Sequence, residues 1–527
     1  MNPDDYLSSD AWRTLEDGIA LGRPLKVWRE RPRHTLDLLD LAPHSDTLDF
    51  LVQGDRRFSF AAFRDGIDKA AAAFAELGVR RGDPVLIVLY NSAEFLLAQW
   101  ALFRLGAVPV FGNRWWSPRE LDDAIARVRP ALVLTDMQPA GAMRIGPDEV
   151  ATWWSRPSSG DIPDPREGSD EDDLAAVVFT AGSTGAPKGV QLSHRNLVWS
   201  QQTIHNMRGA RPPLPTAADR QKVTLISVPM FHNGSIVTGL SALIDGDRIV
   251  LLSGRFDGGE VLDLIDQERV TNWQAVPTMF SRFLDHPTFA DHDLSSLRAP
   301  STGGTHIPAS LVEAIKAKLP HAAPNLVIGY GMTEASFLTM AAMPVIEATN
   351  GSVGKPIPGA ELKVDAPDED GQGELLGRSG ALMIGYLGAA EQPIDADGWF
   401  HTGDLGRIEA DGYVYVTGRV KDMIIRGGEN IACSHVESAL LEHEDVLEAA
   451  VAGYPDAEFG EQVGAIVRLR PGTDVSEGDL SAFARNKLAY FCVPTRWRFV
   501  DEPLPILPTG KVDKVQLKRA LAGKADA

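Results

Sequence analysis

The chain has 527 residues, more than a single hydrophobic core usually supports, so we expect two or three compact units. A formal net charge of -21 disfavours nucleic acid and an anionic bilayer as main partners, because neither would be attracted electrostatically. The start at Met1–Asp5 is acidic where a signal peptide would be basic, and no apolar run approaches the ~20 residues that span a bilayer. We therefore expect a cytoplasmic protein without integral membrane association.

Before about residue 350, short apolar runs alternate with longer helical stretches. Val85–Leu89 is typical of a buried strand, Ala93–Leu105 of a helix that is apolar on most faces, and Val108–Phe111 of another strand. The alternation continues in apolar runs at 174–179, 223–228, 249–252, 273–276 and 326–328, with a helical segment at 308–318. This pattern predicts an α/β fold with largely parallel sheets.

The character of the sequence changes twice towards the C-terminus. After about Asn350, Gly and Pro become frequent and the strand signals shorten to 361–364, 374–376 and 413–417, which predicts a small β-rich lobe. Beyond 418–422, strand and helix signals at 423–425, 436–441, 447–452 and 463–469 indicate a compact α+β unit. We predict a large N-terminal domain with two doubly wound α/β subdomains plus the lobe, followed by a small, mobile α+β C-terminal domain.

The two cysteines, Cys433 and Cys492, are too few for a disulfide framework and lack metal-ligand spacing, so we expect buried thiols.

A loop rich in Gly, Ser and Thr at residues 180–189 follows the apolar strand at 174–179. Its glycines permit tight turns with accessible backbone N–H groups, and its hydroxyls and lysine suit a polyphosphate. The candidate phosphate-binding residues are Thr180, Ser183, Thr184, Gly185 and Lys188. The loop is not a Walker loop, because Pro187 stands where a glycine should precede the lysine. Taken alone, it could equally be a flexible surface connection.

Further motifs follow the loop in order along nearly the whole chain. They are Pro229–His232, Gly329–Glu334, Trp399–Asp404, Gly418–Asp422, Gly427–Asn430 and Pro508–Lys511. In this order they resemble the motifs of the adenylate-forming superfamily, which includes acyl-CoA synthetases, luciferases and the adenylation domains of peptide synthetases. The resemblance implies an acyl-CoA synthetase that uses ATP and Mg²⁺, forms an acyl-adenylate, releases pyrophosphate and transfers the acyl group to coenzyme A.

The resemblance also assigns roles around the phosphates and the metal. Glu334 would be the Mg²⁺ ligand and Thr333 a donor to the α-phosphate, in keeping with the preference of a hard cation for carboxylate and phosphate oxygens. Without the family, Glu334 could be an ordinary helix-initiating acid after Thr333.

The nucleoside would be held by residues from three of the motifs. Tyr330 resembles the residue that stacks on adenine, beside Gly331 and the strip Gly303, Gly304 and Thr305, although Tyr330 could also be a core aromatic. Asp404 resembles the carboxylate that accepts both ribose hydroxyls. Arg419 resembles the arginine that contacts ribose or phosphate. Read alone, these two would be a turn aspartate and a solvated arginine.

Lys511 lies far along the chain from the loop whose ligand it would serve, so it can reach the site only if a separate C-terminal domain carries it there. By resemblance it contacts the carboxylate, the α-phosphate and the ribose during adenylation. Lys421 resembles the domain hinge, which gives predicted domains of 1–420 and 421–527. Rotation about it would replace Lys511 by Gly427, Gly428 and Glu429, which would open a channel for CoA. A simple turn would explain the two glycines equally well.

The acid is the least specified part. His232 resembles a histidine that lines or gates the acyl pocket, although it could be a structural histidine. Residues 233–237 carry no carboxylate, which disfavours an amino acid. Ser301–His306 and Ala335–Phe337, expected to face the acid, have small residues that suggest room for a bulky apolar acid: fatty, alicyclic or a steroid side chain. The alternative functions are an aryl-CoA ligase, a ligase that loads a carrier protein and a non-catalytic nucleotide-binding protein. The sequence leaves open whether the protein is a homodimer.

Overall fold

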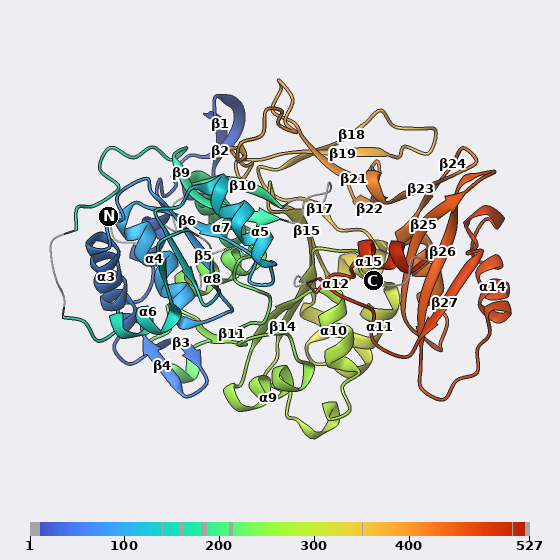
Figure 1. The fold of residues 1–527 in the computed structure, drawn as a ribbon, viewed down its shortest axis with the longest axis horizontal. Helices are drawn as coiled ribbons and strands as arrows, with labels where there is room; N and C mark the ends of the chain where they lie inside the picture. The colour runs from blue at the N-terminus through green and yellow to red at the C-terminus, as the bar shows by residue number, and fades with distance from the viewer. Residues whose placement is uncertain are drawn as a thin grey trace.

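The computed structural model describes residues 11–139, 141–157, 162–180, 187–209, 214–349, 351–507 and 510–521. Within them the chain forms two large mixed sheets, a four-stranded sheet, a five-stranded sheet and a two-stranded hairpin. Figure 1 shows the five-stranded sheet, in orange and red, beside the rest of the molecule. The predicted architecture is confirmed, because a large α/β N-terminal domain precedes a small α+β C-terminal domain.

The seven-stranded sheet has the order β20-β10-β9-β6-β5-β7-β8. Its parallel centre contains the predicted β-α-β unit of β5 (Pro84–Val88), α4 (Ala93–Leu105) and β6 (Val108–Phe111). The helix has sharp limits because Ser92 caps its first turn and Gly106 ends it in the left-handed conformation. The remaining strands are β7 (Leu132–Thr135), β8 (Arg144–Ile145), β9 (Leu174–Thr180), β10 (Lys188–Ser193) and β20 (Gly385–Tyr386). β10 runs antiparallel to β9 and β20, so this edge departs from the predicted parallel pattern.

The nine-stranded sheet has the order β17-β16-β15-β14-β13-β11-β12-β3-β4 and is parallel from β3 to β15. Its strands are β3 (Asp49–Gln53), β4 (Arg56–Ser59), β11 (Val223–Ile226), β12 (Arg248–Leu251), β13 (Asn272–Ala275), β14 (Ala299–Gly303), β15 (Val327–Met332), β16 (Ser336–Ala342) and β17 (Lys355–Pro356). β3 and β4 come from the start of the chain, and their recruitment to this sheet was not predicted. β15 and β16 form a hairpin at the other end of the sheet.

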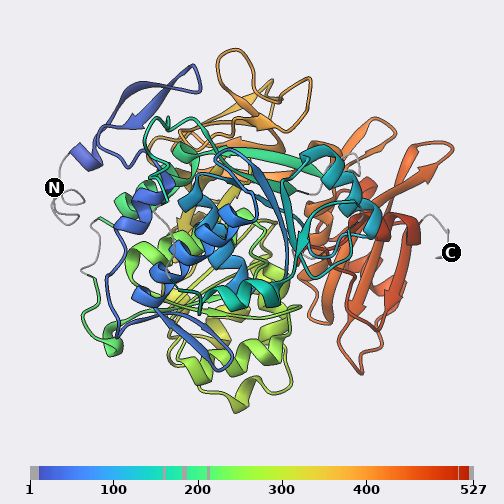
Figure 2. The ribbon, with the colours of Figure 1, turned by 60° about the vertical axis from the view of Figure 1, so that its left-hand side comes forward.

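Helices cover both large sheets (Figures 1 and 2). They are α2 (Thr35–Asp40), α3 (Phe60–Glu76), α5 (Pro118–Val128), α6 (Pro147–Trp153), α7 (His194–Met207), α8 (Asn233–Asp245), α9 (Gly258–Glu268), α10 (Pro277–Leu284), α11 (Ala309–Lys318) and α12 (Met343–Thr349). α7 contacts β9, β10 and β16, whereas α8 contacts α7, β11 and β12. These two helices therefore join the seven-stranded sheet to the nine-stranded sheet. None of the described helices is both long enough and apolar enough to cross a membrane.

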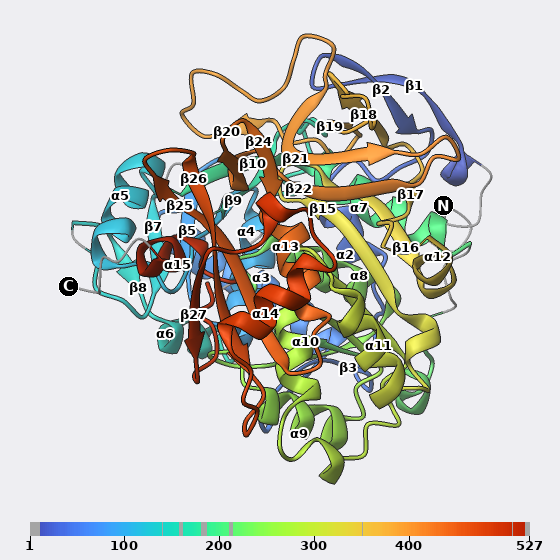
Figure 3. The same ribbon diagram turned by 90° about the vertical axis from the view of Figure 1, so that its right-hand side faces the viewer.

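The β-rich lobe consists of β18 (Glu361–Asp365), β19 (Gly373–Arg378), β21 (Phe400–Ile408) and β22 (Val414–Arg419), and the early hairpin of β1 (Leu15–Ala20) and β2 (Arg23–Trp28). The C-terminal domain, which faces the viewer in Figure 3, contains β23 (Met423–Arg426), β24 (Glu429–Ala432), α13 (Cys433–Leu441), β25 (Val446–Asp456), β26 (Gly460–Leu469), α14 (Glu477–Arg485), β27 (Arg496–Val500) and α15 (Lys514–Leu521). This domain has a core of its own, in which both cysteines are buried free thiols as predicted.

Candidate active site

The turn that carries Lys511 is pressed against the N-terminal domain. The Leu507 N–H donates to the Lys511 carbonyl over 2.6 Å, and the Gly510 N–H donates to the Leu507 carbonyl over 2.8 Å. The Thr278 hydroxyl on α10 donates to the Gly510 carbonyl. Gly510 has a φ of +76°, and a Cβ there would lie only 2.6 Å from Val276 Cγ2. Glycine is therefore required both by the backbone conformation and by the close approach of the two domains.

The Lys511 side chain runs beside Gly304 at the end of β14. A Cβ on Gly304 would lie 3.7 Å from Lys511 Cε and 3.9 Å from Nζ. Burial and the Arg419 charge together lower the pKa of Lys511 to about 8, although Asp404 and Glu334 oppose both effects. The structure thus brings the C-terminal lysine together with three residues of the N-terminal domain that the sequence assigned to one site.

Asp404 is the centre of a buried polar cluster. It is 3% exposed and pairs in register with Arg419 across β21 and β22. The Arg419 Nε lies 2.6 Å from Asp404 Oδ1, and the Tyr330 hydroxyl donates to Asp404 Oδ2 over 3.0 Å. Burial raises the pKa of Asp404, while Arg419 opposes the shift. Asp404 is therefore a buried residue of β21 and not the turn aspartate that its local sequence suggested. Tyr330 is a buried aromatic whose hydroxyl bonds to this carboxylate.

Glu334 lies in the turn of the β15–β16 hairpin with Thr333. The alternative interpretation of Glu334 as a helix-initiating acid is wrong, because no helix follows this turn until α12, which begins at Met343. The Tyr386 hydroxyl donates to Glu334 Oε1 over 2.7 Å, and Lys188 Nζ lies 4.7 Å from the centre of the Tyr386 ring. Tyr386 therefore links the carboxylate to the lysine beside the Gly/Ser/Thr-rich loop. Sequence reasoning missed this tyrosine.

The ends of the loop are fixed although its centre is not described. Thr180 ends β9, Lys188 begins β10, and the two are paired in register. Ser183, Thr184 and Gly185 lie outside the described residues. β9 and β10 therefore form an antiparallel pair near one end of the sheet, where only β20 lies beyond β10. Its position after the carboxyl end of β9 agrees with the prediction.

The glycine strip makes close backbone contact with the neighbouring strand. Gly303 on β14 is in register with Gly329 on β15, and a Cβ on Gly303 would collide with the Gly329 carbonyl oxygen. A Cβ on Gly331 would likewise collide with the Ser336 carbonyl oxygen. Thr305 is exposed just beyond β14. These glycines keep a flat surface at the ends of the two strands, which suits an approaching planar ring.

His232 and the segment Ala335–Phe337 were both predicted to lie near the acid. His232 precedes α8, and its Nε2 is a buried atom without a hydrogen-bond partner among the described residues. Burial and the Lys511 charge lower the pKa of His232 to about 3, so the ring is neutral at physiological pH. Ala335 and Ser336 are buried, with Ser336 bonded to Ser200 on α7 over 2.8 Å. Only Phe337 of that segment is partly exposed.

The predicted CoA-channel residues are located on the C-terminal domain, at the turn between β23 and β24. Gly427 and Gly428 have φ values of +59° and +94°, and the Gly427 N–H donates to the Phe459 carbonyl over 2.8 Å. Glu429 begins β24 and is exposed. Lys421, the predicted hinge, is exposed in the short 3-10 helix η5 (Val420–Asp422) between the lobe and the C-terminal domain.

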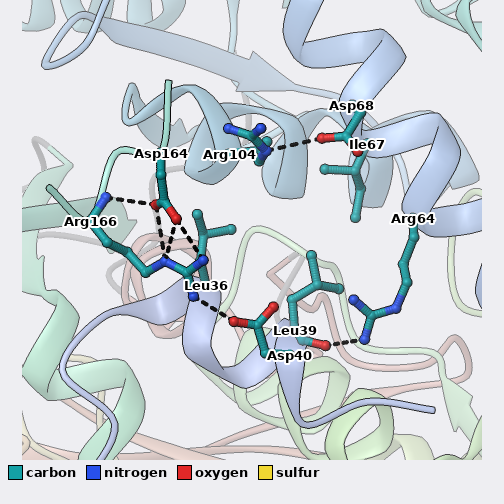
Figure 4. A pocket seen from close by; sticks show the side chains of 9 residues that line it. All are labelled: Leu36, Leu39, Asp40, Arg64, Ile67, Asp68, Arg104, Asp164 and Arg166. Atoms are coloured by element: carbon teal, nitrogen blue, oxygen red, sulfur yellow. Dashed lines mark hydrogen bonds and ion pairs between the residues drawn. The ribbon is translucent and has the colours of Figure 1, made fainter. Parts of the chain in front are cut away.

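A separate cavity of about 190 Å³ lies among α2, α3 and α4 (Figure 4). Its three arginines already have partners: Arg166 pairs with Asp164 and Asp40, Arg104 pairs with Asp68, and Arg64 donates to the Ala42 carbonyl. None of its lining residues belongs to the cluster around Lys511. The cavity is lined by Leu36, Leu39, Asp40, Arg64, Ile67, Asp68, Arg104, Asp164 and Arg166.

Known proteins match the chain over nearly its whole length. The family model described as AMP-binding enzyme matches residues 42–387, and that of the AMP-binding enzyme C-terminal domain matches residues 435–511. A propanoyl:CoA ligase of Rhodococcus jostii, whose acyl group bears a 7a-methyl-1,5-dioxo-octahydroindenyl ring system, is 33% identical over 93% of this chain and 99% of its own. The mitochondrial medium-chain acyl-CoA ligase ACSF2 of Mus musculus is 29% identical over 88% of this chain and 83% of its own. The o-succinylbenzoate CoA synthetase MenE of Bacillus subtilis, solved with ATP and a magnesium ion, matches with a TM-score of 0.77 and 29% identity, covering 92% of this chain and 98% of that one.

Proposed function

Because this chain is a member of the AMP-binding enzyme family, whose homologues are AMP-forming acyl-CoA ligases, we propose that it converts a hydrophobic carboxylic acid into its CoA thioester through an acyl-adenylate. The observation that carries the proposal is the placement of Lys511 beside Gly304, within the electrostatic reach of Arg419, Asp404 and Glu334. A lysine of the C-terminal domain would thereby complete a site on the N-terminal domain.

Adenylation brings two anions together, the carboxylate of the acid and the α-phosphate of ATP. Cations and aimed donors must therefore supply most of the stabilisation of the transition state. Lys511 would hold both anions, and Thr333 would donate to the α-phosphate. Thr180, Ser183, Thr184, Gly185 and Lys188 would hold the β- and γ-phosphates.

The nucleoside would lie on the strip formed by Gly303, Gly304 and Thr305, with adenine against Tyr330 and Gly331. Asp404 and Arg419 would hold the ribose. The existing Tyr330–Asp404 hydrogen bond supports this role, because it fixes one carboxylate oxygen beside the proposed adenine-binding tyrosine.

A magnesium site fits the donors that are present. Among the described residues, no group of three or more His, Cys, Asp or Glu could hold a metal ion by itself. A single carboxylate is sufficient where phosphate oxygens complete the coordination, as is usual for Mg²⁺. Glu334 would be that carboxylate, with Tyr386 orienting it. When bound, the ion would neutralise charge that develops on the phosphates.

Thioester formation would require the site to change partners. We place the domain boundary at 420/421 and the hinge at Lys421, so that rotation removes Lys511 and brings Gly427, Gly428 and Glu429 to the adenylate. Support comes from the separate core of the C-terminal domain, since interfaces between domains of one chain commonly permit relative motion.

The comparisons support a hydrophobic acid without specifying it. The relatives named above act on an alicyclic propanoyl group, on medium-chain acids and on an aryl acid. The test is a screen of pyrophosphate exchange and CoA-dependent AMP release across fatty, alicyclic, steroid-side-chain and aryl acids. We expect exchange with a hydrophobic acid, and AMP release with CoA in preference to a phosphopantetheinylated carrier protein. Absence of exchange with every acid would refute the proposal.

A further inference from the structure

Gln274 is a partly exposed polar residue on an interior strand of the nine-stranded sheet. β13 is hydrogen bonded by β11 on one side and β14 on the other. Its neighbours Trp273 and Ala275 point to the opposite face and are buried. A side chain in the middle of such a sheet is exposed only where it faces a space that the protein does not fill. Gln274 therefore lines an accessible space inside the N-terminal domain.

The same face of the sheet leads from Gln274 towards the candidate site. Ser301 on β14 is in register with Gln274, and Gly303 lies two residues further on the same face. Both are partly exposed. Because two residues of a strand span roughly 7 Å, Gln274 lies about that distance from the strip beside which Lys511 runs. The carboxylate of a bound acid would lie at Lys511, and its distal part would reach Gln274.

The Gln274 amide is held in one orientation. The Thr238 hydroxyl on α8 donates to Gln274 Oε1. A Cβ on Gly234, one turn earlier in α8, would lie 3.6 Å from Gln274 Nε2, so the missing side chain leaves room beside the NH₂ group. None of the hydrogen bonds of the described residues uses this NH₂ group. The amide thus presents a donor, not an acceptor, to the acid.

Building on the function proposed above, we infer that Gln274 selects acids whose apolar ring carries a carbonyl oxygen roughly 7 Å from the carboxylate, which defines the substrate class as alicyclic keto acids. A ring ketone would accept from Nε2 when it displaces water. A purely hydrocarbon ring would displace the same water and leave the NH₂ group without an acceptor. A site built to donate a hydrogen bond rejects the analogue that lacks the acceptor.

The experiment compares two matched acids, 3-(4-oxocyclohexyl)propanoate and 3-cyclohexylpropanoate, by the kcat/KM of CoA-dependent AMP release. We expect the wild-type enzyme to prefer the keto acid by roughly 10- to 100-fold. Gln274→Leu should bring the ratio near one, and Thr238→Val should lower it by releasing the amide. Asn272→Leu is the matched control, because Asn272 lies on the same face of β13 but further from Lys511. It should keep the wild-type ratio.

Equal kcat/KM for the two acids in the wild-type enzyme would overturn the inference without any variant. A ratio that Gln274→Leu leaves unchanged would also overturn it. Neither result would touch the proposed function, since both acids would still be turned over. If no acid of any class supports pyrophosphate exchange, the proposed function itself fails. The two failures are therefore distinguishable.

Discussion

Replacing Lys511 with alanine should separate the two half-reactions. Burial of the Lys511 ammonium group lowers its pKa from 10.5 to about 8. This lowering of the pKa corresponds to roughly 3 kcal/mol against keeping the charge on Lys511. The bound carboxylate and α-phosphate would have to stabilise the charged lysine by at least this free energy. Loss of a preorganised charge of this size slows adenylation by roughly 10²-fold or more.

The assay measures each half-reaction alone. Adenylation is followed by pyrophosphate exchange, and thioester formation by CoA consumption from supplied acyl-adenylate. Lys511→Ala should lower the first and leave the second within about twofold, because the proposed rotation removes the lysine before CoA reacts. Lys518→Ala is the matched control, since Lys518 is exposed on α15 of the same tail and should change neither rate. Equal loss of both half-reactions in Lys511→Ala would refute the reasoning.

Three further outcomes follow from the same site. The kcat/KM of pyrophosphate exchange should fall as the pH rises through about 8, because the cation of Lys511 is present below its folded-state pKa and lost above it; a flat profile to pH 10 would contradict this. Gly428→Phe should slow thioester formation at least 10-fold and spare exchange, whereas Gly472→Phe, also at a positive φ with open space, should spare both. Tyr386→Phe should raise the Mg²⁺ concentration for half-maximal exchange several-fold. Tyr415→Phe is its control and should leave that concentration unchanged, because Tyr415 also donates a hydroxyl hydrogen bond and also has a cation over its ring.

The elements that the sequence predicts best are those with local signals at both ends. The helix at Ala93–Leu105 has the predicted limits because a serine cap precedes it and a glycine in the left-handed conformation ends it. The strand at Val108–Phe111 is also correct to the residue, since its apolar run is short and follows directly. The structure brings Lys511 close to Glu334, Asp404 and Arg419, the residues that motif order predicted to share one site.

What the sequence could not predict depends on pairing between distant segments. Tyr386 meets Glu334 only because β20 pairs with β10, and nothing in the local pattern of Gly385–Tyr386 encodes that pairing. Gln274 has no local signal either, because its exposure depends on which strand becomes interior. The turn at Thr333–Glu334 misled for a related reason: a hydroxyl followed by an acid begins helices and also occupies hairpin turns.

The short helix α10 has a consequence for how this enzyme could change its acid. Thr278 and Arg282 are one helical turn apart, and they bind main-chain carbonyls of the C-terminal segment at Gly510 and Leu504. The same helix continues directly from β13, which carries Gln274. The proposed acid recognition and the proposed placement of the lysine would thus depend on one continuous stretch, residues 272–284. Mutations in this stretch that admit a new acid would also shift the lysine, so a laboratory selection for altered substrates should recover compensating changes near residue 510.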